Sequence, residues 1–318
     1  MLMRVASNSY TNAMLDQFNT LVARQNTLQS EVSTGLSVQT PSDNPVAMQN
    51  TLNYLADNAT QQQYSANIST LQARADTVDN VLQSLQSASS QASQIATSAG
   101  NVTTNSPTQL ATYADQVNQL INQVVTAANT QDPATGQYLF GGTASGAPPY
   151  TTTTGANGDV TAATYNGNST VNQVPIGSNL TATVDIPGAN PGATGARGLI
   201  TDQQSGADFL NHLISLRNDL QAGDTTAIAG TDTANLQHDE NNISFQVANN
   251  GVQQTKLTAA ATFATNNTQS LNQQISDASS ANIVNVMVQL SQAQTAYQAA
   301  LESGSKIMSL SLLNYMPA

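Results

Sequence analysis

The chain of 318 residues contains no cysteine and no tryptophan, and its aromatic content is only 4%. The absence of Cys excludes disulfide bonds, thiolate metal ligands and a cysteine nucleophile. Ala, Ser, Thr, Asn and Gln dominate instead, and such side chains pack closely but bury little apolar area. From this composition we expect no single large hydrophobic core.

Charged residues are also scarce, at 8%, and the 7 Lys and Arg are outnumbered by 19 Asp and Glu. Nucleic acids and anionic membrane surfaces are both bound through Lys and Arg, so we expect neither as a partner. No apolar run approaches the roughly 18 residues that span a bilayer. The segment after Met1 turns polar within a few residues, which predicts that no cleavable signal peptide is present.

Catalytic motifs are nearly absent. The only histidines are His212 and His238, and neither belongs to an HExxH pattern. Consecutive residues point to different sides of a helix, so we interpret His238, Asp239 and Glu240 as solvated surface rather than as a metal cluster. No Lys-Ser or Lys-Thr follows Gly141-Gly142, so a phosphate loop is not expected. The sequence therefore predicts a non-enzyme, with no catalytic residue, metal or cofactor.

Glycine and proline are missing from two long stretches, Val46–Ala99 and Val252–Ser303. The window Pro133–Gly206 holds 13 of the 19 Gly and 6 of the 10 Pro. This distribution predicts a mainly α protein with a β-rich insert. We expect the N- and C-terminal segments to form an elongated antiparallel helical rod or coiled-coil bundle, with a small β domain at the tip. That architecture suits an assembly component better than an enzyme.

The helical segments carry apolar residues at alternating spacings of three and four, which is typical of coiled-coil seams. The N-terminal seam consists of Met14, Phe18, Leu21, Gln25, Leu28 and Val32. The C-terminal seam consists of Ile283, Val286, Leu290, Ala293, Tyr297 and Ala300, with Ile307 beyond Gly304. Polar residues at Gln25, Thr268 and Asn282 either set the register of the helices or are tolerated exposures.

A break follows the first helix. Gly35 is suited to end a helix, and Pro41 and Pro45 forbid continuous helix between them. Asp43 or Asn44 can cap the next helix, with Pro45 in its first turn. Gly35, Pro41, Asn44 and Pro45 therefore form either a hinge that sets how two helices meet or an ordinary connecting loop.

The middle of the chain changes to short Thr- and Val-rich runs at Val160–Tyr165, Val171–Ile176 and Leu180–Ile186, separated by turn residues. Before this region a third helix is expected to begin near Ser106-Pro107, and after it Phe209, Leu213, Leu216 and Leu220 mark a short helix that Gly223 closes. We expect five segments: an outer N-terminal helix (1–44), N-terminal rod helices (45–135), a β-rich outer domain (136–206), C-terminal rod helices (207–279) and an outer C-terminal helix (280–318), which joins 1–44 in one inner-tube domain.

Three passages resemble the flagellin superfamily and, within it, the hook–filament junction family (hook-associated protein 3). LQSEVSTGLSVQTPSDNP, at Leu28–Pro45, is similar to the family's "LSTG…PSDDP" segment. GQYLFGG, at Gly136–Gly142, resembles its "G.Y.FAG" passage, and IMSLSLLNYM, at Ile307–Met316, is close to its "LSLFNYL"-like terminus. Ser42–Pro45 departs from the "DDAAG" sequence of filament flagellins, which favours the junction family. The family's "MR" start would fall at Met3, so either Met1 or Met3 is the true start.

The resemblance implies a structural protein of the extracellular bacterial flagellum, needed for motility and exported through the flagellar type III channel without a cleaved signal peptide. The implied partners are flagellin, another hook-associated protein, further copies of the chain in a ring or helical array, and an export chaperone. The alternatives are a filament flagellin and, from a different class, a secreted coiled-coil adhesin.

The outer helices are the expected subunit interface, because a thin seam rich in Ala gains stability when neighbouring subunits cover it. The alternative is that the seam residues form only an intramolecular core. The interface candidates are Met14, Phe18, Leu21, Leu28, Val32, Ile283, Val286, Leu290, Tyr297, Ile307, Leu310 and Leu313.

Overall fold

A computed structural model describes residues 2–101 and 106–313, with side chains described for 12–101 and 106–306. The chain divides into two compact units. Unit 1 comprises residues 1–60 and 266–318, and unit 2 comprises residues 61–265. The expected segment boundaries at 44/45 and 279/280 coincide with the start of helix α2 (Pro45–Ala99) and the end of helix α6 (Thr233–Ser279). The boundaries between the two compact units, at 60/61 and 265/266, instead lie within these two helices.

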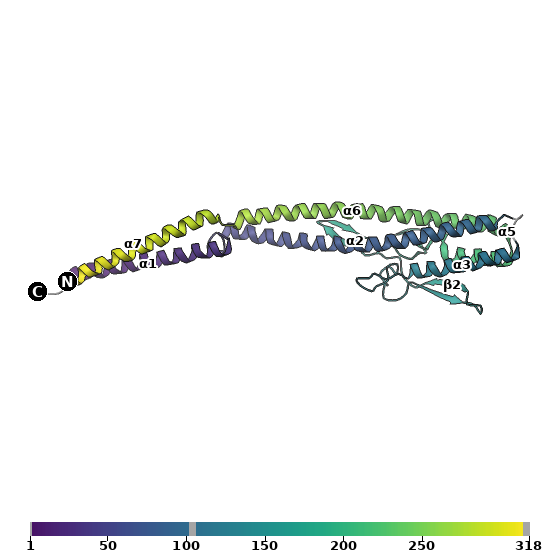
Figure 1. Cartoon of the computed structure of the whole chain (residues 1–318), viewed down its shortest axis with the longest axis horizontal. Coiled ribbons are helices and arrows are strands. Elements are labelled where there is room, and N and C mark those ends of the chain that lie inside the picture. The colour runs from purple at the N-terminus through teal and green to yellow at the C-terminus, as the bar shows by residue number, and fades with distance from the viewer. Residues whose placement is uncertain (1, 102–105, 314–318) are drawn as a thin grey trace. The chain divides into compact units, whose positions relative to one another are not determined.

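Unit 1 is built mainly from α1 (Leu2–Thr34) and α7 (Ile283–Leu313), which run antiparallel side by side (Figure 1). Its apolar cluster is small: Leu28, Val286 and Ala293 are buried, and Val32 and Leu290 are among the partly buried side chains around them. The rings of Phe18 and Tyr297 meet edge to face, with centroids 5.9 Å apart. The two predicted terminal seams thus face each other within one chain.

Unit 2 contains α3 (Pro107–Ala128), α4 (Phe209–Ala222), α5 (Thr225–Ala227), the π-helical turn η1 (Ile228–Asp232), and parts of α2 and α6. Helix α3 begins after Ser106, whose hydroxyl accepts a hydrogen bond from the Gln109 N–H. Helix α4 ends at Gly223, whose φ of 71° lies in the left-handed region that glycine adopts easily. The helix ends predicted from Ser106-Pro107 and Gly223 are confirmed.

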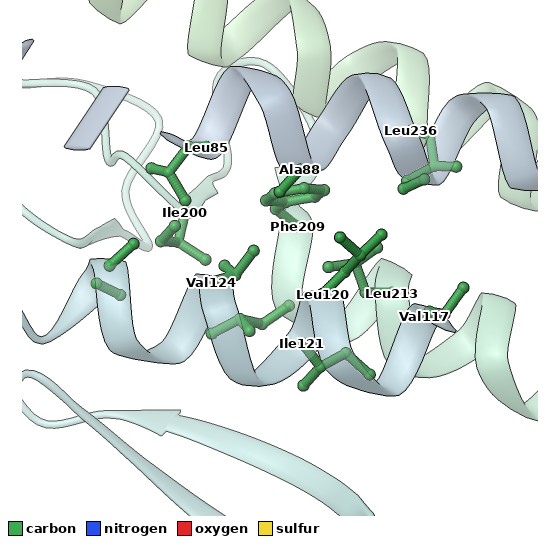
Figure 2. Packing of buried hydrophobic residues seen from close by; sticks show 14 of the residues in the cluster. Leu85, Ala88, Val117, Leu120, Ile121, Val124, Ile200, Phe209, Leu213 and Leu236 are labelled. Atoms are coloured by element: carbon green, nitrogen blue, oxygen red, sulfur yellow. The ribbon is translucent and has the colours of Figure 1, made fainter. Parts of the chain in front are cut away.

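The core of unit 2 is larger than the composition indicated, with 33 buried apolar residues in one cluster among those the structure describes. Figure 2 shows side chains of α2, α3 and α4 directed into a common interior, among them Leu85, Val124 and Phe209. The expectation of no large core was wrong for this unit. Several helical seams meet here, and fully buried alanines such as Ala88 let the helices approach closely.

The β-rich segment forms three small sheets. Strands β1 (Tyr150–Thr154) and β2 (Val160–Tyr165) form an antiparallel hairpin, and β2 has the predicted bounds. A second hairpin joins β3 (Val174–Gly177) and β4 (Leu180–Ala182), which are shorter than the predicted runs. In the third sheet β6 (Thr201–Asp202) lies between β5 (Ala189–Asn190), parallel to it, and β7 (Ala207–Asp208), antiparallel to it.

These strands pack along the helices of unit 2. Tyr150 and Val160 join the main core, and Ile176 and Ala182 belong to a second cluster with Ile68 and other side chains of α2 and α6. The small β region is confirmed, but its buried side chains are shared with the helical cores. Strands of two to six residues are too short to bury a face on one another. Among the described helices, none is long and apolar enough to cross a membrane.

Candidate functional site

Exposed apolar side chains concentrate in unit 1. Of the fifteen large apolar side chains that are exposed among the described residues, eleven lie in this unit, although it is the smaller of the two. They are Leu15, Val22, Leu36, Val46, Leu52, Leu55, Ile283, Val284, Met287, Val288 and Leu301. Exposed apolar surface that gathers in one region marks a contact surface for another macromolecule.

The first turns of α7 carry the densest part of this surface. Val284 is 72% exposed, Met287 56% and Val288 53%, whereas Val286 in the same turns is buried against α1. On a helix, residues four apart lie on one face, so Val284 continues to Val288 and Ile283 to Met287. We name these four residues, Ile283, Val284, Met287 and Val288, the α7 patch. Helix α7 therefore has one apolar face covered by α1 and a second one that is open.

The predicted interface residues divide between these two faces. Leu28 and Val286 are buried in the seam between α1 and α7, and Ile283 is exposed in the α7 patch. Partly buried seam residues are Met14, Phe18, Leu21, Val32, Leu290 and Tyr297. Ile307, Leu310 and Leu313 lie outside the residues whose side chains the structure describes. That the seam residues contact other subunits stays a prediction.

Val284, Met287 and Val288 were missed by sequence reasoning, which assigned one apolar residue per turn to a single seam. The signal was present in the run Ile283-Val284-Asn285-Val286-Met287-Val288, where five of six residues are apolar. A single seam uses apolar residues three and four apart, so consecutive ones must point to other sides of the helix.

Polar groups fix the pairing of α1 with α7 at two places. The Gln25 side-chain amide donates to the Ala293 carbonyl oxygen at 3.1 Å, and Arg24 donates to Gln289 at 3.4 Å. Because the partly buried amide of Gln25 is satisfied by this bond, Gln25 favours one register of the two helices. Asn282 has another role: its side-chain oxygen accepts the Asn285 N–H at 3.2 Å and caps α7.

Two interruptions between helices in unit 1, one after α1 and one after α6, are joined by backbone hydrogen bonds. Gly35 follows α1 with a φ of 73°, and α6 ends at Ser279. The Ala281 N–H donates to the Gly35 oxygen at 2.8 Å, and the Ser37 N–H donates to the Ser279 oxygen at 2.8 Å. The sequence predicted the first break as a hinge or loop, and the structure shows that it is tied to the second.

Two side chains, the carboxylate of Asp43 and the amide of Asn44, stabilise the turn before α2. Asp43 accepts the Gln39 and Thr40 N–H groups at 3.0 and 2.8 Å, and these bonds lower the pKa of its carboxyl group. Asn44 accepts the Ala47 N–H at 3.1 Å and caps α2, which begins at Pro45. The predicted cap is thus Asn44, while Asp43 stabilises the turn that contains Pro41.

Replacing Asn44 with Ala should destabilise unit 1 by about 1 kcal/mol, because the first turn of α2 loses its side-chain acceptor. Thermal unfolding followed by circular dichroism measures the change. The matched control is Asn50→Ala, an exposed residue of the same helix, which should be neutral or slightly stabilising because Ala is the better helix former. Equal melting temperatures for the two variants would contradict the capping role.

One sequence interpretation is corrected in unit 2. Asp239 was expected on a solvated surface with His238 and Glu240, but it is 1% exposed. Its carboxylate lies 2.8 Å from Nδ1 of His212, from a segment 27 residues earlier. The pattern of adjacent residues could not reveal a partner on another helix. In the part of the chain with described side chains, no group of three or more His, Asp or Glu residues is placed to hold a metal ion.

Of the comparisons with known proteins, the one with solved structures gives matches, and these concern the fold. No family model matches the chain, and no curated protein matches its sequence. Among solved structures, a Vibrio parahaemolyticus protein assigned as a flagellar hook-associated protein is 18% identical, with a TM-score of 0.63 over 75% of this chain and 100% of its own. Flagellar hook-associated protein 3 of Legionella pneumophila is 13% identical, with a TM-score of 0.58 over 70% of this chain and 97% of its own.

A third similar structure is FlgL of Xanthomonas campestris, at 16% identity and a TM-score of 0.55, covering 69% of this chain and 98% of its own. At these identities the likeness shows a shared fold. The predicted architecture, helical N- and C-terminal segments with a small β region, is therefore confirmed.

Proposed function

We propose that the chain is a structural protein of the bacterial flagellum that acts as an adaptor at the hook–filament junction and has no enzymatic activity. The observation that carries this proposal is the concentration of exposed apolar side chains in unit 1, in a fold shared with hook-associated proteins. Its partners are flagellin on one side and another hook-associated protein on the other, together with further copies of the chain and an export chaperone. It acts outside the cell, as part of the flagellum.

The physical basis is an unequal distribution of buried apolar residues between the units. Among the residues whose side chains the structure describes, the main cluster of unit 2 has 33 buried apolar residues and the cluster between α1 and α7 has three. Burial of exposed apolar area contributes about 25 cal/mol per Å², so covering the α7 patch would stabilise unit 1 when subunits join. A subunit that contacts its neighbours through different surfaces forms a ring or a helical array.

Deletion of the gene tests the proposal. Electron microscopy should show hooks without filaments, and the culture medium should contain unassembled flagellin. A missing filament with no flagellin in the medium would instead identify the chain as the filament subunit, and normal filaments would point to a secreted adhesin. Restoring the chain without Ser309–Ala318 separates these classes further, because an axial protein should lose motility and an adhesin should keep binding.

A further inference from the structure

Unit 2 encloses a cluster of acidic side chains that the proposed function does not use. His212 of α4 and Asp239 of α6 form an ion pair at 2.8 Å. The other oxygen of Asp239 accepts the backbone N–H of Asp208, in β7, at 2.9 Å. Asp208 in turn accepts a hydrogen bond from the Thr201 hydroxyl at 3.0 Å. This part of the cluster is therefore fully hydrogen-bonded.

Asp232 is the unsatisfied member. It is the last residue of the π-helical turn η1 and is 1% exposed, yet neither of its carboxylate oxygens has a hydrogen-bond partner among the described residues. A π-helical turn is rare and often accompanies a functional site. An ionised carboxylate without a partner is costly to bury. The nearby Ser215 hydroxyl donates to Asp219, at a long 3.5 Å.

The balance of the groups around Asp232 favours its protonated form. Burial first, and then the negative charge of Asp219 on α4, raise the pKa of Asp232 to about 6, against the smaller opposing effects of the Ser215 hydroxyl and of the charge on His212. His212, also on α4, is the cation of the cluster, but it is paired with Asp239. The hydrogen bonds of the guanidinium of Arg217, the other cation of α4, go to Asn118, Val160 and Asn218, away from the cluster.

We propose that the cluster of His212, Asp219, Asp232 and Asp239 is a buried proton-binding site that makes unit 2 more stable in mildly acidic medium than at alkaline pH. Acid ordinarily weakens proteins whose carboxylates are paired when ionised. This site acts in the opposite direction, because Asp232 is more stable in the folded protein when it carries a proton. The inference is independent of the function proposed above.

The direction in which stability changes with pH follows from proton linkage. Burial raises the pKa of Asp239. Burial by itself would lower the pKa of His212, but the hydrogen bond and the charge of Asp239, together with the charges of Asp208 and Asp232, raise it. Together with Asp232, these groups bind more protons in the folded chain than in the unfolded one. The stabilisation is therefore lost as the pH rises, between about 4 and 6 for Asp232 and above 6.5 for His212. The lowered pKa of Asp43 has the opposite effect, since its contribution to stability is lost as the pH falls, but only below its ordinary pKa of 3.8.

The test is urea unfolding of the full chain at pH 5 and pH 8, followed by near-ultraviolet circular dichroism of tyrosine. The ring pair of Tyr150 and Tyr165 in unit 2 contributes to this signal. The unfolding midpoint of the wild type should be higher at pH 5. Asp232→Asn should raise the midpoint at pH 8 and remove most of the difference between the two pH values. The control is Asp115→Asn, an exposed acid on α3 of the same unit, which should behave as the wild type.

Carbon-13 NMR of the side-chain carboxyl groups supplies a second readout. The wild type should show one carboxyl that titrates near pH 6 and is missing from Asp232→Asn. If Asp232→Asn fails to fold, Asp219→Asn replaces it, and removing that neighbouring charge should move the same titration to lower pH. A wild-type midpoint that is equal or lower at pH 5, or the absence of a carboxyl titrating near pH 6, would overturn the proposal.

Discussion

Replacing Phe209 with Ala will destabilise unit 2 by about 3–5 kcal/mol, the usual loss for removing a buried phenylalanine ring. The ring is 1% exposed, at the start of α4, and lies among the side chains shown in Figure 2. The backbone at this residue is fixed as well, since its N–H donates to the Ile200 oxygen at 3.0 Å. The surroundings can therefore relax only partly into the cavity. Such a loss is a large fraction of the 5–15 kcal/mol that holds a typical protein folded.

The matched control is Phe263→Ala, because Phe263 lies in the same unit on α6 and is 66% exposed. Both variants remove the same atoms, so the difference between them isolates burial. Urea unfolding gives the free energy for each, and we expect Phe263→Ala to change it by less than about 0.5 kcal/mol. If the two variants were equally stable, the position of Phe209 in the core would be wrong.

The helices were predictable because their determinants are local. The spacing of Phe209, Leu213, Leu216 and Leu220 predicted α4, and Gly223 predicted its end, as found. The packing of α4 against Ile200 could not be predicted in this way, since periodicity shows which face of a helix is apolar but not what covers it. The same limit explains the large core of unit 2, which forms where several separately predicted seams meet.

The β-rich segment was predictable in type but not in arrangement. Val160–Tyr165 has the Val, Thr and Tyr content that favours strands, and it forms β2. Strands such as β5 and β6 have two residues each, which is too few to show an alternating pattern. Their pairing depends on neighbours distant in the chain, including the Asn242 amide, which donates to the Gly198 and Leu199 oxygens.

For the candidate surface, the sequence predicted only the face of α1 and α7 on which apolar residues recur every seven positions. Leu28 and Val286 follow that repeat, and the structure buries both between α1 and α7. Val284 falls outside the repeat, and its 72% exposure arises because none of the described elements covers that side of α7. Asp239 shows the same limit for charges, because its partner His212 belongs to another helix.

Replacing Val284 with Asn and Met287 with Gln in one variant should leave the monomer folded but block its incorporation into the flagellum. Both side chains are more than half exposed, so the free energy of unfolding should change little. If neighbouring subunits bury both, each loses roughly 1.5 kcal/mol of apolar contact, and the affinity falls about a hundredfold. A deletion strain that expresses this variant should therefore carry hooks with few or no filaments, counted by electron microscopy.

Two further variants separate this contact from the seam and from general surface effects. Val252→Asn alters an apolar residue of unit 2 that is 63% exposed, and it should restore filaments as the wild type does. Leu28→Ala with Leu290→Ala weakens the seam between α1 and α7 instead, so it should block incorporation and also lower the stability of unit 1. Loss of filaments without loss of stability is thus specific to the α7 patch. Normal filaments in the Val284 and Met287 double variant would show that neighbouring subunits do not bury this patch, and the seam would be left as the interface candidate.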